Sequence, residues 1–265
     1  MRIPFTQVDA FADAAFAGNQ AAVMPLSAWL PDATLLAIAQ ENNLSETAFF
    51  LPDESGEADF ELRWFTPGGE VALCGHATLA SGHVVLSSDT ARDRVRFRTR
   101  QAGVLEVAIA DGGYRMALPA WTPAPRDLPA LVAALGVSGV VATLFHDKGY
   151  ALVVVDDEAT VRRAAPDMTA LAAQGDWVAI VAARGRETDI VSRVFVPAFG
   201  IDEDPVTGSA HAVMVPYFAQ ALGRETMTAY QASARGGRLT GELQGDRVIL
   251  GGACVTVIEG AFLLP

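Results

Sequence analysis

The strongest constraint on the fold is an internal repeat with a spacing of about half the chain. Three pairs of short segments match in the same order, at offsets of 133 to 135 residues: 31–37 with 166–172, 75–77 with 208–210, and 103–105 with 237–239. One match would mean little in an alanine-rich chain, but three ordered matches indicate a duplicated unit. We therefore predict two pseudo-equivalent domains with a ligand-binding cleft between them.

The composition is that of a globular protein and excludes several classes of partner. Of the 265 residues, 51% are hydrophobic and 19% are charged, which argues against disorder. The net charge of -12 repels phosphate backbones and anionic bilayers, so we expect neither a nucleic-acid nor a membrane partner. No stretch approaches the ~18 apolar residues of a membrane helix. With only Cys74 and Cys254, a disulfide framework is not expected, and we predict a cytoplasmic protein.

Each half contains one helical segment without any charge. Residues 76–85 are small or apolar on all sides, which predicts a helix buried inside its domain. The counterpart from Ser209 to about Leu222 is equally uncharged, although Pro216 is expected to kink or interrupt it. Period-2 alternation elsewhere, as in residues 60–64, predicts half-buried strands.

These patterns predict an α+β fold with two pseudo-repeated domains, each a curved mixed sheet around a central buried helix. Proline is dense in residues 121–125, where the periodicity stops, which indicates a linker. We therefore predict domains at residues 1–120 and 121–265, with the option that the last few C-terminal residues join the first domain.

Glu46 is the first candidate for chemistry. It lies in the segment 42–50 (NNLSETAFF), where a carboxylate directly precedes an apolar strand. Nearby phenylalanines would desolvate the ionised form and make Glu46 a proton carrier near neutral pH. The alternative is an ordinary surface glutamate in a loop.

A second candidate site lies at Cys74-Gly75-His76, where a strand turns into the buried helix. Gly75 permits close approach to the backbone, and the N–H groups of a helix N-terminus favour a bound carboxylate or phosphate. His76 is either functional or a hydrogen-bonded core histidine. Cys74 is either a nucleophile paired with His76 or a small buried residue.

The segment 202–211 (DEDPVTGSAH) is the corresponding turn of the second half. Its acids fit a solvated loop, but Asp204 followed by Gly208 and Ser209 at the start of an uncharged helix predicts a second set of amide and hydroxyl donors. Two such helix N-termini, facing each other across a cleft, would both favour a substrate carboxylate.

Neither a metal nor a coenzyme is expected. The four histidines and two cysteines do not stand at the spacings typical of metal ligands: His76, His83, His146, His211, Cys74 and Cys254. Glycine-rich dinucleotide and phosphate-loop motifs are also missing from the sequence. We therefore expect no cofactor.

The same segments resemble successive motifs of the PhzF-like phenazine-biosynthesis family. They occur in order along the chain: residues 7–11, 16–19, 43–49, 63–67, 70–78, 204–211 and 251–260. The resemblance implies the diaminopimelate-epimerase fold, in which two related domains each wrap a barrel-like sheet around a central helix. It also implies that Glu46 is a general acid/base and that His76 and Asp204 orient the substrate and assist proton movement. The remaining matches would hold a carboxylate through their amides: Gly75 with His76, and Gly208 with Ser209.

The family's named activity is the isomerisation of trans-2,3-dihydro-3-hydroxyanthranilate by proton movement on the ring, without metal or coenzyme. A homodimer is implied as well. Related epimerases use two cysteines, but residues 202–211 contain no partner for Cys74, which disfavours two-thiol racemisation. We predict an isomerase acting on a small carboxylate-bearing metabolite. The alternatives are an amino-acid epimerase, a non-catalytic binding protein for small acids, and a hydrolase that uses Cys74.

Overall fold

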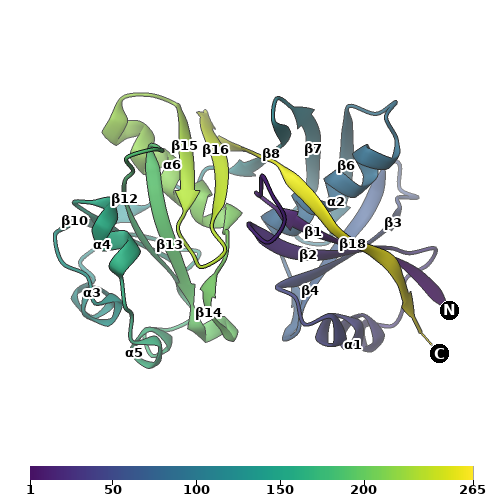
Figure 1. Cartoon of the computed structure of the whole chain (residues 1–265), viewed down its shortest axis with the longest axis horizontal. Coiled ribbons are helices and arrows are strands. Elements are labelled where there is room, and N and C mark those ends of the chain that lie inside the picture. The colour runs from purple at the N-terminus through teal and green to yellow at the C-terminus, as the bar shows by residue number, and fades with distance from the viewer. Residues whose placement is uncertain (265) are drawn as a thin grey trace. The chain divides into compact units, whose positions relative to one another are not determined.

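The computed structural model describes residues 1–264, which form two units with separate cores (Figure 1). Unit 1 contains residues 1–117 and 251–264, and unit 2 contains Leu118–Leu250. Residues 251–264 therefore lie in unit 1, as the option for the last C-terminal residues allowed, and not in a second domain that runs from residue 121 to the end. The reason is that the last strand, β18 (Cys254–Leu263), pairs antiparallel with the first, β1 (Arg2–Ala10), along its whole length.

Unit 1 is a mixed sheet with one helix on each face. Its other elements are β2 (Asn19–Pro25), α1 (Asp32–Asn42), β3 (Glu46–Pro52), β4 (Phe60–Thr66), β5 (Gly69–Val71), α2 (Gly75–Ser88), β6 (Arg94–Thr99), β7 (Val104–Ala110) and β8 (Gly113–Pro119). The strand order is β18-β1-β2-β3-β4-β6-β7-β8, with β5 also on β4. The β2–β3 and β4–β6 pairs are parallel, whereas the others are antiparallel. Helix α2 contacts strands from across this sheet, and α1 packs on β3 and β4.

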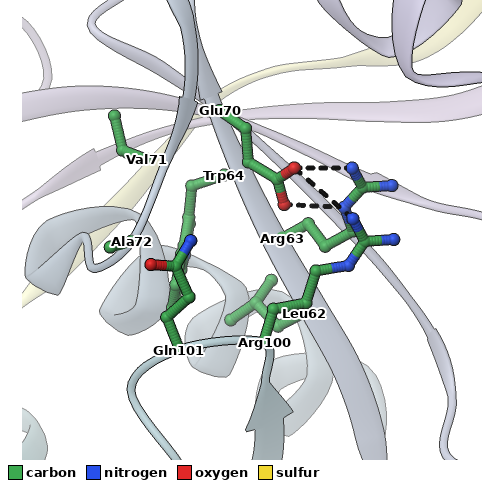
Figure 2. A pocket seen from close by; sticks show the side chains of 8 residues that line it. All are labelled: Leu62, Arg63, Trp64, Glu70, Val71, Ala72, Arg100 and Gln101. Carbon is green, nitrogen blue, oxygen red and sulfur yellow. Dashed lines mark hydrogen bonds and ion pairs between the residues drawn. The ribbon is translucent and has the colours of Figure 1, made fainter.

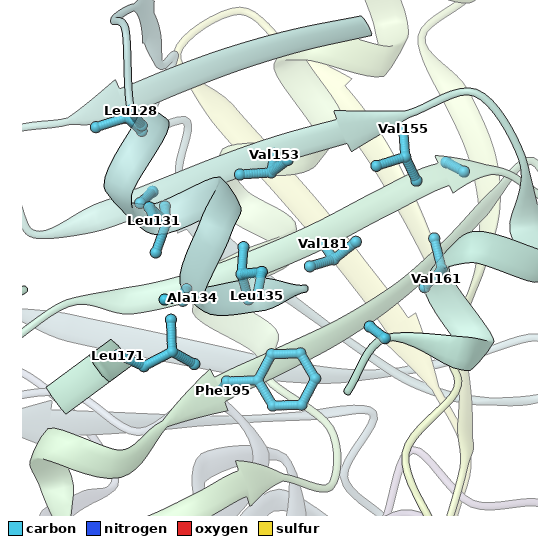
Figure 3. Packing of buried hydrophobic residues seen from close by; sticks show 14 of the residues in the cluster. Leu128, Leu131, Ala134, Leu135, Val153, Val155, Val161, Leu171, Val181 and Phe195 are labelled. Carbon is cyan, nitrogen blue, oxygen red and sulfur yellow. The ribbon is translucent and has the colours of Figure 1, made fainter. Parts of the chain in front are cut away.

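Unit 2 repeats this arrangement with more helices on the outer face. Its elements are β9 (Ala124–Pro125), α3 (Pro129–Leu135), β10 (Val140–His146), β11 (Tyr150–Val155), α4 (Glu158–Arg163), α5 (Met168–Ala172), β12 (Val178–Arg184), β13 (Ile190–Val196), a 3-10 turn η1 (Pro197–Phe199), β14 (Ile201–Asp204), α6 (Gly208–Leu222), β15 (Thr226–Gln231), β16 (Gly237–Gln244) and β17 (Arg247–Gly252). Parallel pairs again occur at equivalent places, β11–β12 and β13–β15. Figure 3 shows the core between α3, α4 and α5 and the strands, where Leu131, Val153 and Phe195 are buried.

An ion pair found in both units shows the duplication at the level of side chains. In unit 1, Arg63 Nε and Nη2 donate to the two oxygens of Glu70 at 2.8 and 2.7 Å. In unit 2, Arg193 donates in the same way to Glu203, at 2.8 Å for both bonds. Each guanidinium also lies over the phenylalanine two residues further along, with its carbon 5.0 and 4.9 Å from the ring centroid. In Figure 2 a second guanidinium, that of Arg100, also approaches Glu70, with Nη1 3.5 Å from Oε2.

The central helices are buried as the uncharged patterns predict. Exposed residues occur only in the last turns of α2 and α6. In each unit one glycine lets the central helix pack closely against a strand. The glycine lies on the helix in unit 1 and on the strand in unit 2. A Cβ on Gly82 of α2 would lie 2.4 Å from Val107 Cγ1 of β7, whereas a Cβ on Gly241 of β16 would lie 2.5 Å from Val215 Cγ2 of α6. The predicted α+β fold is confirmed. No helix within residues 1–264 is long and apolar enough to cross a bilayer.

Pro216 was expected to kink or interrupt α6, and the structure shows that it does not interrupt the helix. The helix runs from Gly208 to Leu222 with the proline inside it. Proline has no N–H, so the carbonyl of Ala212, four residues earlier, loses its helical donor. The backbone N–H of Trp121 donates to this oxygen instead, at 3.0 Å. The segment that was predicted to be only a linker therefore completes the hydrogen bonding of α6.

Candidate active site

Three of the predicted residues meet at the N-terminus of α2. Glu46 is the first residue of β3, Cys74 is the N-cap of α2, and His76 is the second residue of that helix. His76 Nε2 lies 2.9 Å from Glu46 Oε2, and His76 Nδ1 lies 3.5 Å from Cys74 Sγ. The imidazole is buried, while 17% of the Glu46 side chain is exposed. A carboxylate that is partly open to solvent and lies 2.9 Å from the nitrogen of a buried histidine is arranged for proton transfer.

Two further residues orient His76, and the sequence reasoning missed both. Asn19 Nδ2 lies 3.3 Å from His76 Nδ1, and the Ser45 hydroxyl donates to Asn19 Oδ1 at 3.0 Å. Because Ser45 fixes the amide oxygen, the Asn19 nitrogen faces the ring as a donor. The neutral tautomer of His76 then carries its proton on Nε2, the nitrogen that lies 2.9 Å from Glu46 Oε2. The only sequence signal for Asn19 is its place in the 16–19 motif.

Burial and charge act in opposite directions on His76. Burial disfavours the imidazolium, whereas the negative charges of ionised Cys74 and of Glu46 favour it, and the net effect raises the pKa of His76 well above 6.5. Burial, with the charge of Glu46, raises the pKa of the Cys74 thiol. Near neutral pH Cys74 is therefore an uncharged thiol, which leaves the Glu46 carboxylate as the acidic neighbour of His76.

The predicted residues of the second half lie together at the N-terminus of α6. Asp204 ends β14, Thr207 is the N-cap, and Gly208 and Ser209 begin the helix. The Thr207 hydroxyl donates to Asp204 Oδ2 at 2.5 Å, and the Thr207 N–H donates to Gln231 Oε1 at 2.9 Å. Gln231 Nε2 donates in turn to the Asp204 carbonyl oxygen at 2.7 Å. This network fixes Asp204 at the turn, and no motif in the sequence pointed to Gln231.

His211 has a structural role in α6. Its Nδ1 donates to the Thr207 carbonyl oxygen at 2.8 Å, and its Nε2 has no hydrogen-bond partner in residues 1–264. Burial lowers its pKa to about 4, so the ring is neutral. In α2 the Thr78 hydroxyl donates to the Cys74 carbonyl oxygen in the same way, at 2.5 Å. Both central helices thus close their first turn with a side chain four residues after the N-cap.

Glu46, Cys74 and His76 form the only group of three candidate metal ligands in the described part of the chain, with ligand atoms within 4.8 Å of one another. The thiol faces Nδ1 of the ring, whereas the carboxylate faces Nε2. A single ion bound to one ring nitrogen would therefore meet only one of the two other ligands without rearrangement. The arrangement suits a proton relay better than a metal chelate.

The chain is similar to known proteins over nearly its whole length. The model of the phenazine biosynthesis-like protein family (PhzC-PhzF) matches residues 8–260. The chain belongs to this family. It is 46% identical over 266 residues to an uncharacterized isomerase of Pseudomonas aeruginosa, with 100% of both chains covered. These matches confirm the resemblance that the motifs predict.

Solved structures extend the similarity of this PhzF-family chain to the fold. A PhzF-family protein of Enterococcus faecalis has a TM-score of 0.92 at 42% identity, with 100% of both chains covered. A hydroxyproline epimerase from Agrobacterium vitis has a TM-score of 0.64 at 12% identity, over 98% of this chain and 92% of the other. The second likeness shows only that the epimerase-type fold is shared.

Proposed function

We propose that this PhzF-family protein is an isomerase that moves a proton between carbon atoms of a small carboxylate-bearing metabolite, without metal or coenzyme. The observation that carries the proposal is the contact of 2.9 Å between His76 Nε2 and Glu46 Oε2. The similarity to a protein named an isomerase in Pseudomonas aeruginosa supports the reaction class.

In the proposed reaction Glu46 is the proton carrier. Its carboxylate removes a proton from a substrate carbon, so that a C–H bond breaks and its electron pair delocalises into the conjugated system of the substrate. The resulting carboxylic acid returns the proton to a different carbon, where a new C–H bond forms. Nothing is oxidised or reduced. His76 contacts the carboxylate through Nε2 and holds it in position for the transfer.

The helix N-termini supply the proposed anion site. The N–H groups at Gly75 and His76 begin a helix of 14 residues, and those at Gly208 and Ser209 begin one of 15. Such ends carry partial positive charge and donors without an intrahelical partner. We expect a substrate carboxylate at one of them, oriented by Asp204, which is itself held by Thr207. By family resemblance, trans-2,3-dihydro-3-hydroxyanthranilate is the model compound.

Amino-acid epimerisation is the second candidate, because Cys74 Sγ lies 3.5 Å from His76 Nδ1. A thiol at this position could act as a second proton carrier. Two observations weigh against it: burial raises the pKa of Cys74, and the N-cap of α6, which corresponds to Cys74, is Thr207. We therefore rank the single-carboxylate isomerase first.

The test is proton exchange with solvent. The protein is incubated in deuterated water with a panel of small acids that includes trans-2,3-dihydro-3-hydroxyanthranilate and both enantiomers of several amino acids. Deuterium incorporation and product formation are followed by NMR. We expect deuterium to enter an isomerised ring acid, and Cys74→Ser to retain this activity. Loss of activity in Cys74→Ser together with exchange at an amino-acid α-carbon would indicate the epimerase, and binding of a panel acid without exchange would indicate a non-catalytic protein.

A further inference from the structure

The loop between β1 and β2 presents an exposed phenylalanine in an unusual backbone conformation. Phe16 is 84% exposed, and its φ is +74°. A left-handed backbone is unfavourable for a residue with a bulky side chain, and an exposed aromatic ring adds no core packing. The backbone N–H of Phe16 donates to Asp9 Oδ2 at 2.8 Å, and Asp9 is only 1% exposed. A buried carboxylate therefore holds Phe16 in this conformation.

The rest of the loop is tightly packed. Gly18 has a φ of +65°, and a Cβ there would lie 2.2 Å from the Ala10 carbonyl oxygen. Ala12 N–H donates to the Ala253 carbonyl oxygen at 3.1 Å. The base of the loop is thus defined by specific contacts, while the ring of Phe16 remains outside. A strained backbone that is held by specific contacts indicates that the exposed Phe16 side chain has a functional role.

The loop leads directly to the proton relay. Asn19, three residues after Phe16, contacts His76 Nδ1 at 3.3 Å. Three residues span at most about 11 Å, so Phe16 lies near the residues that orient His76.

We propose that Phe16 contacts the apolar body of the substrate and covers the Glu46–His76 pair during proton transfer. This inference rests on the proposed isomerase function. Between removal and return, the proton resides on Glu46, whose side chain is 17% exposed and would exchange with water in an open site. An aromatic ring laid over a planar, unsaturated substrate excludes that water and adds face-to-face contact.

The first measurement is binding, which needs no turnover. The probe is 3-hydroxyanthranilate, a planar carboxylate whose aromatic ring offers no sp³ C–H bond to break. By calorimetry, Phe16→Ala should weaken its binding ~10-fold, the effect of losing one aromatic contact. Phe16→Tyr keeps the ring and should bind within about twofold of wild type. Phe16→Gly should show the same loss as Phe16→Ala without a lower Tm, because glycine tolerates the φ of +74°.

The second measurement distinguishes covering from simple contact. The protein converts trans-2,3-dihydro-3-hydroxyanthranilate in deuterated water, and the fraction of product that carries solvent deuterium is measured at low conversion. Wild type should return part of the original protium. Phe16→Ala should move the deuterated fraction towards one, whereas Phe16→Tyr should match wild type.

The outcomes separate this inference from the proposed function. If the affinity and the deuterated fraction of Phe16→Ala equal those of wild type, the inference is wrong, and a simultaneous change in sedimentation would make Phe16 a contact between copies of the chain. A wild type that already returns only deuterium would exclude the covering role. If wild type binds the probe but exchanges no proton of any acid in the panel with deuterated water, the isomerase proposal fails and the affinity of Phe16→Ala still decides the contact. A wild type that neither binds nor exchanges overturns both.

Discussion

The first turns of α2 and α6 share a backbone design but carry different chemistry. Strand pairing aligns the two units: Thr47 lies opposite Phe65 in unit 1, and Ala179 lies opposite Phe195 in unit 2. The residue before each is Glu46 in the first unit and Val178 in the second. The strand position that carries the candidate acid in unit 1 is therefore apolar in unit 2.

The difference shows which features belong to the scaffold and which to the chemistry. The arginine–glutamate pairs and the side-chain bonds that close the first helical turns occur in both units, so they stabilise the fold. Glu46 and His76 occur once, and so does the Asp204 network. The proposed proton transfer therefore involves residues of unit 1 that have no counterpart in unit 2.

Removing the acid of unit 1 is expected to have the largest effect. Glu46→Gln keeps the size and a hydrogen-bonding group but cannot carry the proton, so turnover should fall by ~10²-fold or more while binding of 3-hydroxyanthranilate is retained. Turnover is measured by NMR on samples quenched at set times, and the affinity for 3-hydroxyanthranilate is measured by calorimetry.

The matched control for this prediction is Glu57→Gln, which changes an exposed glutamate. Its turnover should equal that of wild type. Proton exchange at the wild-type rate in Glu46→Gln would instead assign the chemistry to another group, with Cys74 the first to examine.

The duplication can be tested by the free energy of unfolding when the glycine–valine contact of unit 1 is replaced by the valine–glycine contact of unit 2. Gly82→Val places methyl groups into Val107 and should destabilise the protein by about 2–3 kcal/mol. Adding Val107→Gly reproduces the arrangement of Val215 and Gly241. Urea denaturation should show the double variant to be at least about 1 kcal/mol more stable than Gly82→Val alone. Simple additivity of the two changes would mean that the two contacts are not equivalent.

Many of the features compared here could be predicted from the sequence, because they depend on local residue patterns. Uncharged helices must be buried wherever they lie, and Cys74 and His76 are only two residues apart, so their proximity needed no tertiary information. Glu46 was singled out by its place before an apolar strand. Repeat offsets likewise pointed to two domains before any strand pairing was known.

Other features depend on strand pairing that no local pattern encodes. Asn19 reaches His76 because β2 and β3 are parallel, with Ala21 opposite Glu46, and Gln231 reaches Thr207 from the end of β15. The return of β18 to β1 places residues 251–264 in unit 1. Tolerance of Pro216 required a donor to the Ala212 carbonyl from Trp121, which lies 91 residues before Ala212 along the chain.

The histidines of the two units should give opposite pH dependences. His211 has its pKa lowered to about 4 when folded, against about 6.5 in the unfolded chain. The unfolded state then binds more protons, so stability falls as the pH drops from 6.5 towards 4, by about 2 kcal/mol between pH 6.5 and 5. His76, with a raised pKa, contributes stability that is complete below pH 6.5 and lost as the pH rises through its folded pKa.

Denaturation across this pH range measures both effects. His211→Gln keeps an N–H donor for the Thr207 carbonyl but cannot titrate, so the loss of stability below pH 6.5 should become smaller by about 2 kcal/mol. If the stability of His211→Gln still falls below pH 6.5 as in wild type, a group other than His211 causes the loss. His76→Gln should alter only the limb above pH 6.5.

A smaller effect is expected from the hydroxyl that holds Asp204 in unit 2. Thr207→Val keeps the shape but removes the donor to Asp204 Oδ2 and the acceptor for Gln231 Nε2, which lies 3.2 Å from the hydroxyl oxygen. If Asp204 orients the substrate, kcat/KM for trans-2,3-dihydro-3-hydroxyanthranilate should fall about 10-fold, which corresponds to about 1.4 kcal/mol. Thr207→Ser retains the hydroxyl and should stay within about twofold of wild type. Thr207→Cys gives α6 the same N-cap as α2, and since the thiol is a weak donor and acceptor, its activity should follow Thr207→Val. A gain of amino-acid racemisation in Thr207→Cys would instead favour epimerisation, the second candidate function.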